Sequence, residues 1–271
     1  MRGMSRTSLA EVEERLAPVT GTAEAATAIG DELFAVAGVL ASQPALRRAL
    51  SDPSRSAQAR ADLASTVLTG KVSTEALGLI MAVAAARWSA PGDLTDAVEQ
   101  LAVQAIVAAA EEEGRLDDLE DELFRFGRIV AGQPELRVML TNPFISAEAK
   151  SQLLSQLLAA RTTPEALRLI TQAAVNPLGR SLDVSLEDYA RLAARRRERL
   201  VAEVHVAVAL TEQQRSRLAA ALGAAYGHQV HLNVVLDPRV SGGMTVRIGD
   251  DLIDGSVATR LAEAGRRLVA R

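Results

Sequence analysis

The chain repeats itself at a fixed distance of 90 residues, and this repeat constrains its fold more than any other feature. Residues 31–80 and 121–170 align without gaps, and 22 of the 50 aligned positions are identical. The segment Asp31–Phe34, for example, returns as Asp121–Phe124. Identity at this level is the mark of an internal duplication, so the two copies should share one fold.

Both copies have the pattern of packed helices. Apolar residues fall on one helical face in the first copy and return at the same spacing in the second: Ile29, Leu33, Val36 and Leu40, then Leu119, Leu123, Phe126 and Val130. Short helices should follow Pro44 and Pro134 and end before Pro53 and Pro143, because proline disfavours helical geometry in the residue before it. Hydroxyl side chains predict caps for later helices at Ser56, Ser146 and Thr163. We expect Leu63, Val67, Leu153 and Leu157 to face inward.

The stretch between the copies predicts a continuous connection. Asp93–Gly114 has no strong helix breaker before Gly114, so it should form one long helix that ends the first copy and opens the second. Its placement would join the two copies directly and not through a flexible linker.

The hydrophobic period changes near residue 200. Val204, Val206 and Val208 alternate with polar or small residues, as in a half-buried strand. Thr211–Gln214 fits a capping box at the start of a helix. Further strands are predicted around 230–236, 244–248 and 252–253, and Ser256 would cap a last helix. The chain should therefore end in a small β-α-β-β-β-α unit over 200–271.

The chain lacks the residue constellations of a catalyst or a metal site. It has no cysteine, which excludes disulfides and thiolate chemistry. Its 30 basic and 34 acidic residues argue against a general nucleic-acid binder, and the basic cluster Arg195–Arg199 has only Tyr189 as an aromatic neighbour. His228 and His231 have no carboxylate or thiol at ligand spacing, so surface histidines are favoured over a metal site. We expect no catalytic residue, no cofactor and no metal.

Membrane and phosphate sites are also disfavoured. Apolar runs such as Ala76–Ala86 and Ala105–Ala110 fall far short of the roughly 18 residues of a membrane span. Met1–Ala10 lacks the apolar core of a signal peptide, so we expect no direct membrane insertion. Gly242-Gly243 precedes a strand and not a helix, which predicts a bulge or a close backbone approach instead of a phosphate cradle. Trp88 should pack between helices.

Short segments of the tail resemble the C-terminal signature of the ATP synthase delta subunit family, whose mitochondrial member is the oligomycin sensitivity-conferring protein. They are Val235–Pro238, Gly242–Met244, Val246–Asp250 and Ile253–Ser256. The resemblance extends over about residues 93–271. It assigns a structural signature to Asp237, Pro238, Gly242, Gly243, Gly249, Asp254, Gly255 and Ser256.

The resemblance adds domain bounds to the fold that the repeat and the change of period predict, an α-helical bundle built on a duplicated unit and followed by a small α/β C-terminal domain. Residues 93–199 would form a six-helix bundle domain, 200–271 the C-terminal domain, and 1–92 an extra N-terminal helical repeat. It implies a non-catalytic peripheral-stalk subunit of the proton-translocating F-type ATP synthase. Such a subunit links the catalytic head to the stalk, so that rotor torque drives ATP synthesis.

The resemblance also implies the partners and the location. The bundle would hold the N-terminal helices of the alpha subunits, and the C-terminal domain would meet the b-type stalk subunit. The protein would be a peripheral membrane protein on the cytoplasmic face of the cell membrane, with no nucleic-acid partner.

We expect the partner helix to lie between the helices Asp93–Gly114 and Thr163–Asn176, in a groove lined by Val103, Ile106, Val107, Leu167 and Ile170. The first copy should be an extension, so that a chain without residues 1–88 would still bind the head. The alternative is a free-standing helical adaptor or regulatory protein outside the ATP synthase. An enzyme comes third, with no residues to support it.

Overall fold

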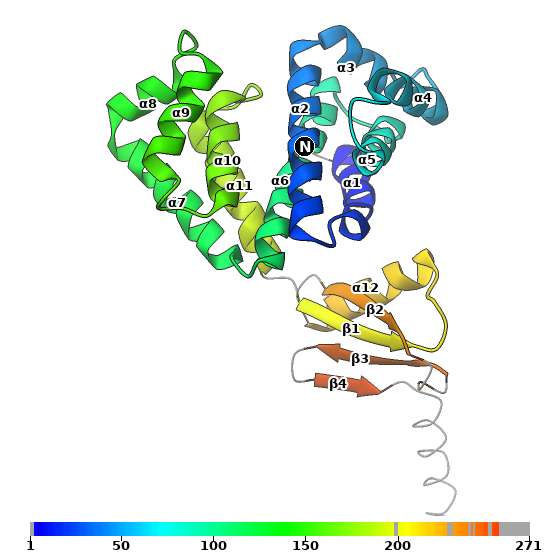
Figure 1. The fold of residues 1–271 in the computed structure, drawn as a ribbon. Helices are drawn as coiled ribbons and strands as arrows, with labels where there is room; N and C mark the ends of the chain where they lie inside the picture. The colour runs from blue at the N-terminus through cyan, green and yellow to red at the C-terminus, as the bar shows by residue number, and fades with distance from the viewer. Residues whose placement is uncertain are drawn as a thin grey trace, which may run out of the picture. The chain divides into compact units, whose positions relative to one another are not determined.

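The structure is a computed structural model that describes residues 3–197, 200–226, 230–237, 240, 242–248 and 251–254. The chain divides into two compact units, Met1–Ala194 and Arg195–Arg271 (Figure 1). We call them the helical unit and the α/β unit. Both copies of the repeat lie in the helical unit.

The helical unit is built from helices that follow one another through short turns. In chain order they are α1 Met4–Glu13, a 3₁₀ turn Ala17–Val19, α2 Ala23–Ser42, α3 Pro44–Ser51, α4 Ala57–Leu68, α5 Thr74–Ala85, α6 Pro91–Glu112, α7 Leu116–Gly132, α8 Pro134–Thr141, α9 Ala147–Leu158, α10 Pro164–Val175 and α11 Leu182–Arg197. The predicted long helix between the copies is confirmed as α6.

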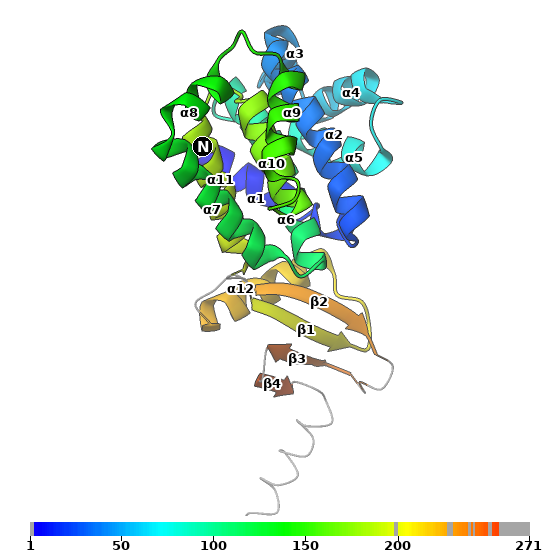
Figure 2. The same cartoon turned by 60° about the vertical axis from the view of Figure 1, so that its left-hand side comes forward.

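The offset of 90 residues shows that the two copies share α6. It carries α2–α5 onto α7–α10, and it also carries α1 into α6 and α6 onto α11. In the described chain, α1–α6 and α6–α11 are therefore two six-helix bundles with one helix in common. Helix α6 lies between the other helices of the two bundles (Figures 1 and 2). Every residue from Leu101 to Ala110 is buried as a result.

A close contact fixes α2 against α6. A Cβ placed on Gly30 would lie 2.5 Å from Ile106 Cδ1 and 3.2 Å from the carbonyl oxygen of Ala102. Only glycine therefore fits at residue 30 without a shift of its neighbours. Small residues line the same seam, with Ala26, Ala108 and Ala109 in one buried cluster.

Polar contacts within each copy repeat with the same offset. The Glu32 carboxylate accepts hydrogen bonds from Ser73 N at 3.1 Å and Ser73 Oγ at 2.6 Å, and Glu122 accepts from Thr163 N at 2.8 Å and Oγ1 at 2.7 Å. The predicted caps are confirmed, since Ser56, Ser146 and Thr163 each accept from the backbone N–H three residues later.

The predicted inward face of two helices is shifted by one residue. On α9, Leu157 is 44% exposed and Leu154 is fully buried; on α4, Leu63 and Val67 are half-buried and Ala64 is fully buried. The same inward face of α4 and α9 begins with a buried cation, Arg60 on α4 and Lys150 on α9. Arg60 donates to the carbonyl oxygens of Ala84, Ala85 and Ala86, and Lys150 donates to that of Ala174.

Helix α2 is long and apolar enough to cross a membrane, judged by length and composition alone. The lengths of uninterrupted apolar runs did not indicate this, because Asp31 and Glu32 divide the helix. Its apolarity has another explanation in the structure. Ile29, Leu33, Val36 and Leu40 are buried, as predicted, in the core that α2 shares with α6. Trp88 is buried as expected, and its Nε1 donates to the carbonyl oxygen of Val83 at 2.8 Å.

In its described part, the α/β unit is a four-stranded sheet with the helix α12 Glu212–Tyr226. The strands are β1 Leu200–Val206, β2 Val230–Leu236, β3 Met244–Ile248 and β4 Asp251–Asp254, in the order β2-β1-β3-β4. Strand β1 is parallel to β2 and antiparallel to β3. Val208, which we placed in the first strand, follows it and is exposed. The capping box is confirmed at Thr211 and Gln214. The predicted final helix lies outside the described residues.

Candidate functional site: a groove between the two copies

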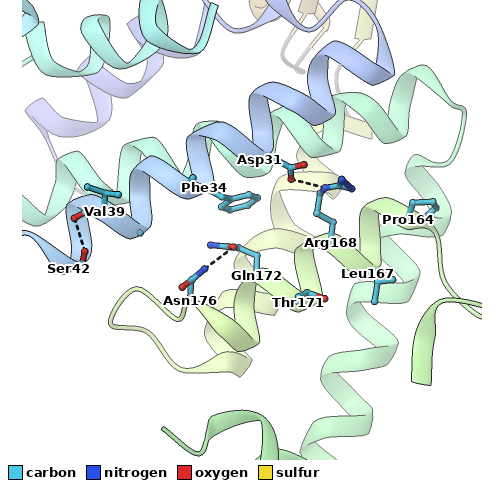
Figure 3. A pocket seen from close by; sticks show the side chains of 12 residues that line it. Asp31, Phe34, Val39, Ser42, Pro164, Leu167, Arg168, Thr171, Gln172 and Asn176 are labelled. Carbon is cyan, nitrogen blue, oxygen red and sulfur yellow. Dashed lines mark hydrogen bonds and ion pairs between the residues drawn. The ribbon is translucent and has the colours of Figure 1, made fainter. Parts of the chain in front are cut away.

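Helices α2 and α10 line a groove between the two copies (Figure 3). The groove has a volume of about 750 Å³. Its lining comes from α2 and from α10 with the residue after it: Asp31, Phe34, Ala35, Gly38, Val39 and Ser42, then Pro164, Leu167, Arg168, Thr171, Gln172 and Asn176. Both helices run in the same direction along it, since Asp31 lies beside Arg168 and Ser42 shares the other end with Asn176.

The residues that line the groove are of three kinds: apolar, uncharged polar and one ion pair. Phe34, Val39 and Leu167 supply apolar surface, and Thr171, Gln172 and Asn176 supply uncharged polar groups. Asp31 Oδ1 accepts from Arg168 Nε at 2.7 Å across one end. Because both charged side chains are more than a third exposed, this ion pair contributes less than about 1 kcal/mol.

The groove has the length of a short helix. From Asp31 to Ser42 the axis of α2 rises by roughly 16 Å, which is about three helical turns. A second hollow of about 480 Å³ continues from it and shares Gly38, Ser42 and Asn176. The surface is thus long enough for one short amphipathic helix.

The groove is not lined by the residues that we predicted for it. Val103, Ile106, Val107 and Ile170 are at most 1% exposed and lie in the core, and only Leu167 lines the groove. The reason is that α2 from the first copy packs on α6 and covers the face that we expected to be open. The sequence signal that could have revealed this packing is the run Leu33–Ala41 of α2, which contains no polar or charged side chain.

The signature residues of the tail that the structure describes lie at strand ends. The backbone N–H of Asp237 donates to the carbonyl oxygen of Val206 at 3.0 Å, and its carboxylate lies 3.5 Å from His205 Nδ1. Gly242 and Gly243 have φ angles of +99° and +82°, a conformation that favours glycine. Asp254 ends β4. Pro238, Gly249, Gly255 and Ser256 lie outside the described residues.

A buried polar cluster joins α11 to α6. Glu99 is 1% exposed; it accepts a hydrogen bond of 2.6 Å from Tyr189 Oη and pairs with Arg180. Arg180 also lies 3.2 Å from Asp188. Burial raises the pKa of Glu99, which the Tyr189 hydroxyl and Arg180 partly offset, and burial also raises the pKa of Asp96 and of Tyr189.

These groups hold α11 against α6 and do not form a ligand site. The Glu99 carboxylate is satisfied by Tyr189 and Arg180. Within the residues that the structure covers, there is also no group of three histidine, cysteine, aspartate or glutamate side chains that could hold a metal ion.

Comparison with known proteins identifies the family. The model of the ATP synthase delta (OSCP) subunit matches residues 98–268. The chain is 47% identical to ATP synthase subunit delta of Streptomyces coelicolor, with 100% of this chain and 99% of that one covered. It is 46% identical to the same subunit of Thermobifida fusca, with 99% of each chain covered, and of Acidothermus cellulolyticus, with 100% of each covered.

The chain belongs to the ATP synthase delta (OSCP) subunit family. It is a non-catalytic peripheral-stalk subunit of an F-type ATP synthase, and so a part of a membrane-bound complex that serves ATP synthesis and ion transport. The alternative of a free-standing adaptor is not favoured. The alignments with the Streptomyces coelicolor and Acidothermus cellulolyticus subunits include the N-terminal copy, since they cover the whole of this chain.

One solved chain, from the mitochondrial ATP synthase hexamer of Toxoplasma gondii, also matches. It is 20% identical, covers 62% of this chain and 96% of its own length, and superposes with a TM-score of 0.28. This overlap is too low to carry an argument.

Proposed function

We propose that the protein ties the catalytic head of the ATP synthase to the peripheral stalk by its two units. The helical unit holds an N-terminal helix of an alpha subunit in the groove between α2 and α10. The α/β unit meets the end of the b-type stalk subunit. The protein works on the cytoplasmic face of the membrane and does not insert into it.

The groove is the observation that carries this proposal. A partner helix needs an apolar channel of a few turns with polar groups along its edge. The groove supplies Phe34, Val39 and Leu167 over about three turns, with Thr171 and Gln172 beside them. The Asp31–Arg168 pair neutralises the charge at one end, so the occupant would present an uncharged apolar face.

The division of the chain into two compact units supports the proposal that the α/β unit binds a second partner. Two compact units with their own cores can carry different partners. In the α/β unit, Leu252 and Ile253 are 61% and 45% exposed on β4, a strand at the edge of the described sheet. Exposed apolar side chains on an edge strand are typical of contact surfaces.

Calorimetric titration of the full chain tests the proposal. A peptide of the alpha-subunit N-terminus should bind the chain, and Gly38→Arg should weaken that binding at least tenfold, because an arginine at residue 38 would fill the groove. A Cβ at Gly38 meets nothing within 4 Å, so the fold should tolerate the change. Gly127→Arg on α7, also in open space, is the matched control and should bind as the natural chain does.

The same titration addresses the other unit. Leu252→Asp should weaken binding of a peptide from the C-terminus of the stalk subunit and leave the alpha peptide unaffected. Equal loss of both peptides in one variant, with the fold intact by circular dichroism, would contradict the division of roles.

A further inference from the structure

The seam between α6 and α11 contains buried polar side chains on both helices. Glu99 on α6 and Tyr189 on α11 are buried, and so are Thr95 and Ser185, one turn earlier on the same two helices. Among the described residues, Thr95 Oγ1 and Ser185 Oγ have no hydrogen-bond partner. Burial of a polar group without a partner costs free energy. The seam therefore holds α11 less firmly than a fully apolar seam of the same size would.

One carboxylate of α6 binds α11 at two places. Tyr189 Oη, in the middle of α11, donates to Glu99 Oε1 at 2.6 Å. Arg180, in the turn that leads into α11, pairs with the other oxygen of the Glu99 carboxylate. Contacts between α6 and the start of α11 thus depend on the charge of a single buried group.

Negative charge exceeds positive charge around Glu99. The acidic groups that act on it are Asp96 of α6 and Asp188 of α11, and the cation is Arg180. Arg180 divides its charge, because Asp188 Oδ2 lies 3.2 Å from it, and Asp188 in turn pairs with Arg191 at 3.1 Å. An ionised Glu99 is therefore only partly compensated, whereas a protonated Glu99 carries no charge to compensate.

The turn that carries Arg180 is strained. Leu178 has a φ angle of +49°, which a residue with a branched side chain rarely adopts, and Gly179 follows at +84°. The Leu178 side chain packs against the core. Such a backbone persists only while the surrounding contacts hold it. Loss of the Glu99–Arg180 contact would remove one of those contacts.

The first copy lacks this arrangement. The offset of 90 residues carries Leu9 onto Glu99 and Ala90 onto Arg180, so neither charged group has a charged counterpart there. The last helix of the first copy, α6, is fixed between two bundles. The last helix of the second copy, α11, ends the helical unit, and the α/β unit begins at Arg195. The charged contacts are thus found in the copy whose last helix connects the two units.

We propose that Glu99, Tyr189 and Arg180 form a proton-sensitive latch that sets how firmly α11 is held on α6. The latch is tightest when Glu99 carries a proton, because a neutral carboxylic acid is easier to bury than a carboxylate and still accepts the hydrogen bond from Tyr189. Ionisation of Glu99 loosens the start of α11, and with it the segment that connects the helical unit to the α/β unit.

The direction of the pH dependence follows from the burial of Glu99. Burial raises its pKa while α11 is docked, and the Tyr189 hydroxyl and Arg180 partly offset this rise. When α11 is detached, Glu99 is solvated and has the ordinary glutamate pKa of about 4.3. The tighter hold is then fully present below the ordinary pKa and is lost as the pH rises through the raised pKa.

Hydrogen exchange of the full chain, followed by mass spectrometry, tests the latch. Protection of α11 peptides, corrected for the intrinsic exchange rate, is compared with that of α10 peptides from about pH 5 to about pH 8. The ratio of α11 to α10 protection should fall about threefold or more as the pH rises. Glu99→Gln should make the ratio independent of pH. Glu32→Gln on α2, the matched control, should leave the fall as in the natural chain.

Two further variants keep the test decisive. Glu99→Leu introduces the residue of α1 at the equivalent position and should also give a flat ratio, so the test does not depend on the folding of one variant. Tyr189→Phe removes a hydrogen bond that favours the ionised carboxylate and should move the fall to higher pH.

Three results would overturn the latch. They are a flat ratio in the natural chain, an equal fall in the natural chain and both Glu99 variants, and a fall that Tyr189→Phe does not move. A loss of protection in α10 and α11 together would show that the whole unit opens, which also contradicts a local latch.

Discussion

The two copies of the repeat differ most in what surrounds their equivalent residues. Phe34 on α2 is 5% exposed because it packs in the core that contains residues of both copies, whereas its counterpart Phe124 on α7 is 59% exposed. The contacts that hold each copy together are kept, as Glu32 with Ser73 and Glu122 with Thr163 show. After the duplication, the contacts within each bundle were therefore kept, whereas equivalent residues on the outer faces came to have different surroundings.

The shared helix shows the same lesson. The first helix of the first copy, α1, has polar residues on its exposed side, such as Arg6, Thr7 and Glu11. The first helix of the second copy, α6, is covered on both sides and consists largely of alanine, valine and leucine over the same positions. Equivalent helices therefore diverge in sequence as their burial diverges.

Removal of residues 1–88 is the strongest test of whether the second copy can stand alone. From the sequence we expected this truncated chain to bind the head. The structure changes the expectation, because α6 would lose α2 and expose the seam around Ala102 and Ile106. Loss of that burial should exceed the stability of a typical domain, about 5–15 kcal/mol, so we expect no cooperative thermal unfolding of the remaining helices.

Truncation after Ala194 provides the control for this experiment. It removes the other compact unit, and the helical unit should keep its melting temperature within a few degrees in circular dichroism. A sharp unfolding transition of residues 89–271 that is assigned to the helices would show that the second copy is independent of the first.

Arg60 and Lys150 are buried cations at equivalent positions of the two copies, but they form different numbers of hydrogen bonds. Arg60 donates to carbonyl oxygens at the end of α5 and also to those of Asp52 and Arg55, whereas Lys150 makes one contact of 3.5 Å. Arg60→Ala leaves several buried carbonyls without a donor and should cost about 3 kcal/mol. Lys150→Ala should cost about 1 kcal/mol. Urea unfolding of both variants would measure the two losses of unfolding free energy. Equal losses would contradict the predicted difference between the two copies.

The phenylalanine pair sharpens the comparison of outer faces. Phe34→Ala should destabilise the helical unit by about 3 kcal/mol, because it leaves a cavity beside α6. Phe124→Ala removes a side chain that is mostly in water and should cost less than about 1 kcal/mol. Chemical denaturation of the two variants gives the answer, and a larger loss for Phe124 would mean that the exposed face of α7 is packed in solution.

The buried carboxylate of α6 has no counterpart in α1, where Leu9 occupies the equivalent position. Burial raises the pKa of Glu99 in the folded chain, so its contribution to stability is greatest at low pH and is lost as the pH rises through that raised pKa. Glu99→Gln should flatten this part of the pH dependence of the unfolding free energy above the usual glutamate pKa of about 4.3. An unchanged pH profile would show that other groups cause the dependence.

Much of this architecture could be predicted from the sequence, because local patterns determine it. The apolar spacing around Leu33 and Leu123, the caps at Ser56 and Ser146 and the alternation in β2 and β3 each depend on a few neighbouring residues. The α/β fold of the tail followed from the change of period and from the family signature.

The groove could not be predicted, because it depends on how the copies meet. None of the ten residues of α1 is identical to its counterpart in α6, so the alignment did not reveal the shared helix. Without it, Val103 and Ile106 had the pattern of an open apolar face. The packing of α2 on that face buries them and moves the accessible surface to α2 and α10.

Simultaneous binding of two partner peptides tests the connector function most directly. The full chain is first saturated with the alpha N-terminal peptide and then titrated with the C-terminal peptide of the stalk subunit. If the two units hold different partners, the stalk peptide should bind with the same affinity with and without the alpha peptide, and a ternary complex should form. Competition between the peptides, or binding of the stalk peptide that Gly38→Arg abolishes, would contradict a connector with one partner at each unit.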